Sequence, residues 1–477
     1  MLSTARMNCF GRSFSSLLFL IAVTASYSAE VPLTSQQSEW LKKSHRFERK
    51  GWVYLHIEGD ASARGFQHGY WLAPEIEQGL RKVKVGWEYQ SAMTWPWLVE
   101  KAAKMFVPKI DGENLAEMEG IAAGLHTRGL NVTRDEIIAY NGIIELTGYW
   151  WPIEEKKIKD GPTAPVKESC SAFIATGSFT RDGNVVLGHN TMSGYADVLP
   201  NIIADIVPDH GHRILWQACA GWIHSGMDFF ITDAGLVGAE TTIGGFEGFD
   251  PDGVPEFTRM RRATQDATTI DQWCDIMKRG NNGGYANAWL IGSTRTKEIA
   301  RLELGLKYIG FQRTHDGYFV GSNVAEDPKI LRFETSSHET DIRASSVARR
   351  VRWKQLMREH RGKIDLAKAK AFEADHYDSY LQRVVPDGRT LCGHFELDRE
   401  PAGAWPGVPF GCAGTLDAKV VDSRMASQMA FAARWGSACG RAFKADRFLK
   451  EHPQFEWMTG VLSDRPSQPW ADFRAGE

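Results

Sequence analysis

The sequence predicts an α+β fold in which helices cover antiparallel sheets. Patterns along the chain run in the order helices, strands, helices, strands, helices. The strand candidates come mostly in adjacent pairs that short turns can join as hairpins, which favours antiparallel sheets over a parallel doubly wound sheet. A hydrophobic content of 43% and a charged content of 24% are typical of globular proteins, so the chain can bury a sizeable core.

The first 28 residues have the order of a secretory signal peptide. Arg6 and Arg12 precede an apolar run at 17–25, and the small residues Ser26 and Ser28 follow it. The run is shorter than the roughly 20 residues that a membrane span needs, and no later segment is as apolar and as long. We therefore expect cleavage after Ser28 and an exported protein without a stable membrane span. It would be secreted or periplasmic, or lysosomal or extracellular in a eukaryote.

Residues 29–169 are predicted to form a mostly helical segment. It contains one strand at 52–59 and helices at 63–85, 113–129 and 133–147, with a further helix within 30–50. Gly65 and Gly69 lie four residues apart, which suits close helix packing. Residues 154–168 are charged, contain two prolines and lack periodicity, as a linker does.

Residues 170–477 are predicted to form the catalytic domain. Strands are expected at 171–177, 184–190, 200–207, 213–219, 228–233, 235–242, 286–293, 298–304, 306–312 and 318–323. Helices are expected at 257–280, 343–361, 365–380 and 424–450.

Composition limits the possible partners. The net charge of −3 and the absence of any dense Lys/Arg run argue against a nucleic-acid partner. The 17 Trp and 24 Phe residues are explained by core packing. An apolar substrate groove is the sharper alternative, with Trp150, Trp151, Phe229, Phe230 and Trp289 as candidates.

Several weaker signals favour ordinary structural roles. His210 and His212 flank a glycine after Pro and Asp, so a hairpin turn is favoured over a metal site. Arg261 and Arg262 are expected on a solvated helix face. The sequence contains no CxxC, so it predicts neither a zinc site nor any other metal ligand set, and no cofactor is expected. Cys392 and Cys412 flank a Pro/Gly-rich loop and form the favoured disulfide.

Cys170 begins a predicted strand directly after the linker. A cut between Ser169 and Cys170 would make this cysteine a new N-terminus. Its α-amine, with a pKa of about 8, could then act as the base for its own thiol. The thiol could make that cut by attacking the Ser169 carbonyl. A buried structural cysteine is the alternative, and spacing alone favours it.

The segments CSAFIATG at 170–177 and RDGNVVLGHN at 181–190 resemble the start of the mature chain in cysteine N-terminal-nucleophile (Ntn) hydrolases. The phospholipase B-like proteins and the penicillin acyltransferase-like (C45) peptidases are the most similar families. Further segments agree in order along the chain, namely 57–73, 258–273, 285–290, 416–421 and 455–457. The resemblance implies a four-layer αββα sandwich of two antiparallel sheets, with residues 29–169 as a propeptide segment that stays associated.

The resemblance also implies roles for individual residues. Cys170 would be the nucleophile, Asn287 the oxyanion donor, and His189 a polar neighbour of the nucleophile. Many relatives carry an Asp that contacts the new amine, but this chain has Met192 there, which favours the phospholipase B-like branch. Asn190 and Glu303 are then the supporting candidates for holding the amine.

Three functions remain open from the sequence. The first is an autoproteolytic hydrolase of amide or ester acyl bonds, acting on a small acyl amide or a lipid-like substrate. The second is an acyltransferase that passes the acyl group to an amine. The third is an exported, non-catalytic ligand-binding protein.

Overall fold

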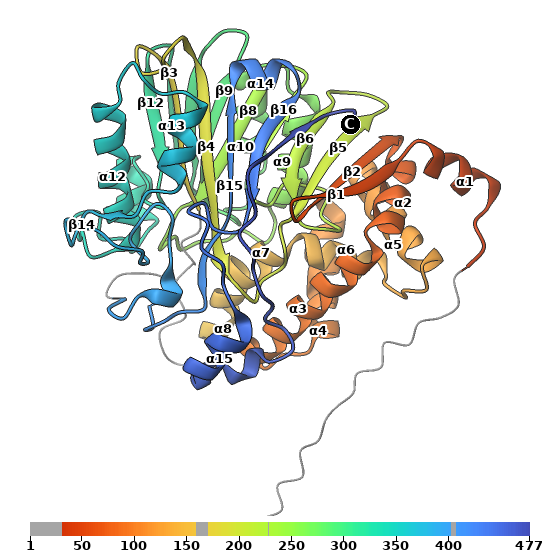
Figure 1. The fold of residues 1–477 in the computed structure, drawn as a ribbon. Coiled ribbons are helices and arrows are strands. Elements are labelled where there is room, and N and C mark those ends of the chain that lie inside the picture. The colour runs from red at the N-terminus through yellow and green to blue at the C-terminus, as the bar shows by residue number, and fades with distance from the viewer. Residues whose placement is uncertain (1–30, 159–169, 228, 402–406) are drawn as a thin grey trace, which may run out of the picture.

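The computed structural model describes residues 31–158, 170–227, 229–401 and 407–477. It is a four-layer sandwich in which two facing sheets lie between two layers of helices (Figure 1). The predicted αββα architecture is therefore confirmed. The predicted signal peptide and most of the linker lie outside the described residues.

The larger sheet has nine strands in the order β1-β2-β5-β6-β7-β8-β9-β10-β11. Neighbouring strands are antiparallel, except that β2 pairs parallel with β5. The strand bounds are β1 His45–Arg49, β2 Trp52–Gly59, β5 Ile202–Pro208, β6 Ile214–Ala218, β7 Phe229–Thr232, β8 Leu236–Thr242, β9 Asn287–Ser293, β10 Ile299–Leu304 and β11 Ile309–Thr314.

The smaller sheet has six antiparallel strands in the order β12-β3-β4-β15-β16-β17, so β3 and β4 are internal. The bounds are β3 Ser171–Gly177, β4 Gly183–Gly194, β12 Gly317–Gly321, β15 Ala413–Asp422, β16 Ala430–Trp435 and β17 Ala471–Arg474. A separate hairpin pairs β13 (Tyr377–Asp378) with β14 (Arg383–Val384).

Helices of the N-terminal third and of the 256–278 region cover the larger sheet, and α12 and α13 cover the smaller one (Figure 1). Their bounds are α1 Ser35–Lys42, α2 Ala61–Trp71, α3 Ala73–Ser91, α4 Trp95–Phe106, α5 Gly112–Thr127, α6 Arg134–Asn141, α7 Ile143–Glu145, α8 Trp151–Ile158, α9 Glu256–Asp266, α10 Ile270–Lys278, α11 Pro328–Phe333, α12 Ser345–Glu359, α13 Leu366–Glu373, α14 Ser423–Ser427 and α15 Ala445–Glu451.

Alternation along the inner strands sorts side chains between two cores. In β3, Ala172 and Ile174 point into the layer between the sheets, whereas Phe173 and Ala175 pack under α12 and α13. Both faces of the strand are apolar because both faces are covered, so it reads as a continuous hydrophobic run.

The N-terminal segment shares a sheet and a core with the remainder of the chain. Strands β1 and β2 form one edge of the larger sheet, and α2 lies against α5. A Cβ built on Gly65 would lie 2.0 Å from the carbonyl oxygen of Glu117, and one on Gly69 would lie 2.1 Å from that of Ile121. Only glycine permits this approach, as the spacing of the two glycines predicts.

A buried ionic cluster joins this helix pair to α9. Glu117, 1% exposed, accepts hydrogen bonds from Arg64 Nη2 at 2.9 Å and Arg261 Nη1 at 2.8 Å. The prediction of a solvated helix face is therefore wrong for Arg261, which is itself 1% exposed. Sequence spacing places a residue on a helix but does not show which neighbouring helix covers it.

Substituting Glu117→Gln is expected to lower the free energy of unfolding by about 3 kcal/mol, because two buried guanidinium groups would lose their shared carboxylate. Urea denaturation would measure the change. Glu119→Gln, on the exposed side of the same helix, is the matched control and should change stability by less than about 0.5 kcal/mol. Equal effects of the two substitutions would contradict the assignment.

The helix predicted at 424–450 is wrong, because this segment contains β16 between two short helices. Alanine-rich AFAARW suits a helix locally, but pairing with β15 and β17 completes the smaller sheet. The helix predicted at 63–85 is interrupted at Leu72, where α2 ends and α3 begins at Ala73 with Pro74.

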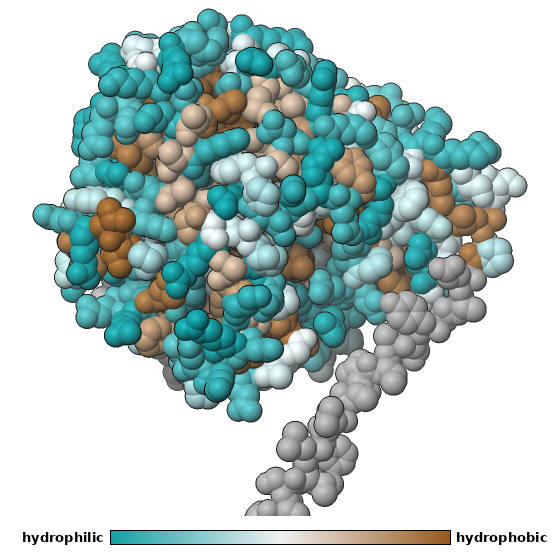
Figure 2. All heavy atoms as spheres, in the orientation of Figure 1, coloured by the Kyte–Doolittle hydropathy of each residue, from teal (hydrophilic) through white to brown (hydrophobic). Residues whose placement is uncertain are grey.

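No helix within the described residues is long and apolar enough to cross a membrane. The visible face is mostly hydrophilic, with scattered apolar groups (Figure 2).

Candidate active site

Cys170 immediately precedes β3, and it lines a large cavity. Its side chain is 3% exposed, and its φ of 74° lies in the left-handed region that non-glycine residues rarely adopt. Backbone strain of this kind concentrates at functional sites. Ser169, on the other side of the predicted cleavage point, lies outside the described residues.

Both strands that flank β3 bring polar residues to the level of Cys170. The register pairs Ser171 with Asn190 of β4 and Gly321 of β12 with Ala172. Continuing the register with β4 by one residue sets Thr191 opposite Cys170. On the other side the chain leaves β12 at Gly321, and Asn323 follows two residues later. Thr191 also lines the cavity, and its hydroxyl accepts a hydrogen bond from Lys419 Nζ at 2.6 Å.

Arg349 of α12 binds both Cys170 and Asn323. It is 1% exposed, and its Nη1 donates to the Cys170 carbonyl at 2.8 Å while Nη2 donates to Asn323 Oδ1 at 2.7 Å. The Asn323 amide in turn donates to the Thr242 carbonyl at 2.7 Å. Asn323 has a φ of 70°, so the guanidinium fixes two left-handed residues relative to each other.

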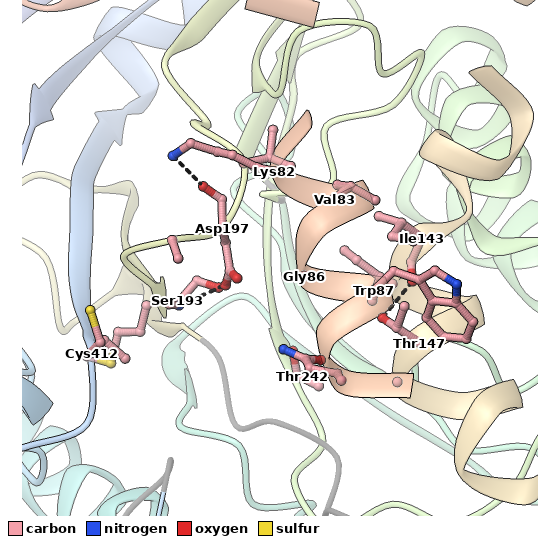
Figure 3. Close-up of a pocket in the computed structure, with 18 of the residues that line it drawn as sticks. Lys82, Val83, Gly86, Trp87, Ile143, Thr147, Ser193, Asp197, Thr242 and Cys412 are labelled. Atoms are coloured by element: carbon pink, nitrogen blue, oxygen red, sulfur yellow. Dashed lines mark hydrogen bonds between the residues drawn. The ribbon is translucent and has the colours of Figure 1, made fainter. Parts of the chain in front are cut away.

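The cavity has a volume of about 1480 Å³, larger than the roughly 300–1,000 Å³ of ordinary ligand pockets. Figure 3 shows Trp87 and Ile143 on one wall and Ser193 and Cys412 on the other. Most of the remaining wall is apolar or aromatic, including Val83, Ile144, Tyr149, Trp151, Trp222, Met227, Leu416, Trp457 and Met458.

Lys82 brings a positive charge to this largely apolar space. It is 3% exposed, and its Nζ donates to the Asp197 carbonyl at 3.2 Å (Figure 3). Loss of hydration on burial lowers the pKa of Lys82 to about 7, and Arg465 nearby acts in the same direction. The amine therefore changes its charge near neutral pH.

His189 lies in the layer between the sheets, opposite Ala172 in the register of β3 and β4. Its Nε2–H donates to the Glu240 carbonyl at 3.0 Å, and Nδ1 has no hydrogen-bond partner among the described residues. Burial holds the pKa of the imidazole well below its usual range, so the ring is neutral. It lies near Cys170 along the sheet but does not line the cavity.

Asn287 begins β9, opposite Thr242 of β8. It is 0% exposed, and both polar atoms of its amide lack hydrogen-bond partners within the described chain. Thr242 and Tyr285 line the cavity, whereas neither Asn287 nor Asn323 does, so both amides lie behind the residues of the cavity wall.

Asn190 and Glu303, the predicted supporting residues, both have side chains directed away from the cavity. Asn190 points to the outer face of its sheet, where its amide donates to the carbonyls of Glu373 and Leu391 at 2.7 and 2.9 Å. Glu303 accepts the backbone N–H groups of Glu326 and Asp327. Neither lines the cavity, because strand alternation and loop caps direct both side chains elsewhere.

Most of the other sequence hypotheses resolve as structural roles. Of the five aromatic candidates, only Trp151 lines the cavity, and the others belong to the cores. His210 lies in the hairpin turn between β5 and β6, as predicted, and its side chain bonds to Glu113. His212 bonds to a different carboxylate, that of Asp233. Cys392 and Cys412 do not form the predicted disulfide; Cys412 lines the cavity, whereas Cys392 contacts His394.

Sequence reasoning missed Asn323 and Arg349. The available signal for Asn323 was its position at the end of a predicted strand. The sequence does not show that this strand lies beside the one that follows Cys170, because that depends on the strand order in the sheet. Arg349 resembles any helix arginine in the sequence, and only the packing of α12 brings it to Cys170.

Two sheets between helical layers, with Cys170 directly before an internal strand, match the architecture of the Ntn-hydrolase class that the motifs predict. Within it, the phospholipase B family model matches residues 114–306. This match confirms the resemblance to phospholipase B-like proteins.

Individual relatives agree over parts of the chain. Putative phospholipase B-like 2 of Bos taurus is 34% identical over 142 residues, which cover 26% of this chain and 23% of the relative. Putative phospholipase B-like 1 of Caenorhabditis elegans is 23% identical over 348 residues, or 66% of this chain and 58% of the relative. The match thus spans about a quarter of the first relative's length. A mutant conjugated bile acid hydrolase of Clostridium perfringens aligns with a TM-score of 0.31 and 9% identity, over 55% of this chain and 88% of that one.

Proposed function

We propose that the protein is an autoproteolytic cysteine hydrolase that cleaves amide or ester acyl bonds of substrates with a long apolar acyl group. The observation that carries this proposal is the position of Cys170. A strained cysteine, predicted to become an N-terminus, opens into a large apolar cavity and has its carbonyl fixed by a buried arginine.

Maturation would begin with attack of the Cys170 sulfur on the Ser169 carbonyl carbon. The C–N bond to Cys170 breaks, the nitrogen takes a proton, and a thioester forms. Water then hydrolyses the thioester, which leaves one chain ending in Ser169 and one beginning with a free thiol and α-amine. Relief of the left-handed strain at Cys170 would favour this step.

Turnover would use the same thiol on an external acyl group. The α-amine removes the thiol proton, the sulfur attacks the acyl carbon, and the proton passes to the departing amine or alcohol. Water completes the cycle by releasing the acid. An acceptor amine in place of water would give acyl transfer, and product partition with added amines separates the two outcomes.

The geometry favours Asn323 as the oxyanion donor. It lies two residues beyond the end of β12, the strand that neighbours β3. Arg349 bonds both its Oδ1 and the Cys170 carbonyl, which fixes its orientation close to the cysteine. A donor that is already aimed at the developing charge lowers the barrier without reorganisation during the reaction. In this proposal His189 is a positioning residue, and Asn287 is the alternative donor.

The apolar cavity predicts a dependence on acyl length. Each added methylene that enters the cavity contributes about 0.8 kcal/mol, so kcat/KM should rise about fourfold per methylene until the acyl group fills the space. A homologous series of N-acyl amino acids and of lysophospholipids would measure this. A rate that does not change with acyl length would contradict the assigned groove.

Lys82 predicts a pH dependence for anionic substrates. Its pKa in the folded protein is about 7, so the ammonium is present below that pH and is lost above it. Affinity for a carboxylate or phosphate group should therefore weaken as pH rises through 7. In Lys82→Met the KM for an anionic substrate should be higher than in the wild type, and it should not change with pH across this range. A neutral ester of the same acyl chain is the control.

We also propose that the protein is exported, on the basis of its N-terminal sequence pattern. The test is N-terminal sequencing of the secreted protein. It should give one chain beginning after Ser28 and a second beginning at Cys170.

A further inference from the structure

A cluster of two histidines and two cysteines lies away from the cavity, on the outer face of the smaller sheet. His376 follows α13, Cys392 and His394 lie in the loop that precedes β15, and Cys439 lies in the turn after β16. One ligand atom from each of the four residues falls within 4.8 Å of all the others. Among the described residues, Cys392 and His394 are buried, and the other two are half-buried.

We propose that these four residues form a structural zinc site. Zinc is held tetrahedrally, with bonds of about 2.3 Å to sulfur and about 2.0–2.1 Å to nitrogen, so a sulfur and a nitrogen on one ion lie about 3.6 Å apart. Nε2 of His394 lies 3.6 Å from Cys392 Sγ and 3.4 Å from Cys439 Sγ. The protein therefore already holds these atoms at the separations that the ion requires.

Neighbouring groups match those of a zinc site. Nδ1 of His394 lies 2.9 Å from Glu396 Oε1, and Glu396 also accepts a hydrogen bond from Tyr195 at 3.1 Å. A carboxylate on the far nitrogen of a histidine orients the ring and increases its affinity for metal. Nε2 of His376 is buried and lacks a hydrogen-bond partner among the described residues, so this ring has a nitrogen that no protein group occupies.

Two thiolates and two neutral imidazoles give a divalent ion a neutral site, which suits a largely buried position. Four protein ligands fill the tetrahedron, so the site is closed and structural rather than catalytic. It would tie together three segments that are distant in sequence. One of them includes Leu391, whose carbonyl holds Asn190 of β4, the strand beside the nucleophile strand. The ion would thus fix the outer cover of the sheet that carries Cys170.

The sequence does not show this site because only Cys392 and His394 are close along the chain. The pattern is CxH, with the other two ligands 16 positions before Cys392 and 47 positions after it, by residue numbers 376, 392 and 439. Folding alone brings them together.

Metal analysis of the purified full-length protein tests the proposal. Protein purified without chelator should contain about one zinc per chain. Cys439→Ser should lose it, whereas Cys274→Ala, which removes a buried thiol from α10, should retain it. Cys170→Ala should also retain it, which separates this test from the proposed catalysis.

A second measurement covers the case in which the Cys439 variant does not fold. The reduced, metal-free wild-type protein is titrated with Co²⁺ alone. One equivalent should produce the visible bands of tetrahedral cobalt with thiolate charge-transfer bands, and Zn²⁺ should abolish them. The proposal is overturned if reduced protein binds neither ion stoichiometrically, or if native protein contains no metal and peptide mapping finds a Cys392–Cys439 disulfide.

Discussion

Replacing Cys170 with alanine is expected to leave a single uncut chain and to reduce kcat by at least about 10³-fold, because both reactions would lose their nucleophile. Intact mass and SDS gels measure the cut, and release of acid from an N-acyl amide measures turnover. The site accommodates a smaller side chain beside a cavity, so the variant should fold, and its urea midpoint should remain close to that of the wild type.

Cys274→Ala is the matched control for this experiment. It also removes a buried thiol, but from α10 on the far side of the larger sheet, so cutting and turnover should be unchanged. Cys170→Ser should still be cut slowly, because a hydroxyl can attack the same carbonyl with lower nucleophilicity. If Cys170→Ala matures and turns over normally, the protein is instead a binding protein or uses another nucleophile.

Local patterns predicted β3, β4 and most of the strands of the larger sheet, because alternation and hairpin turns are encoded over a few residues. Motif resemblance predicted the αββα sandwich, which periodicity alone could not.

The predictions failed where distant segments decide the outcome. The AFAARW segment became β16 because two partner strands needed it, and Arg261 became buried because α5 presents Glu117 to it. The site behaves in the same way. Asn190 is adjacent in sequence to Thr191, yet alternation turns Asn190 away from the cavity and places Thr191 in its wall.

Removing the side-chain amide that binds the oxyanion is also expected to lower kcat strongly. The sequence favours Asn287 and the geometry favours Asn323, and leucine at each position removes the amide at nearly constant volume. At Asn323 leucine also takes a left-handed φ and breaks the bonds to Arg349 and the Thr242 carbonyl, so this variant should also lower the free energy of unfolding. Asn323→Leu is expected to lower kcat about 10²–10³-fold, the usual cost of losing one oxyanion donor, with a smaller change in KM.

Asn287→Leu should behave differently. Its buried amide makes no hydrogen bond within the described chain, so an apolar replacement should leave the free energy of unfolding unchanged or raise it. Its kcat should also stay within about threefold of the wild-type value.

Steady-state kinetics and urea denaturation on both variants decide between the two residues, and Arg349→Lys tests whether the arginine positions Asn323. A lysine keeps the charge but cannot bind Cys170 and Asn323 through one planar group, so it should reproduce the kcat loss of Asn323→Leu. If Asn287→Leu alone lost kcat, the oxyanion would be bound behind the present cavity wall, and the pocket would have to open there during maturation.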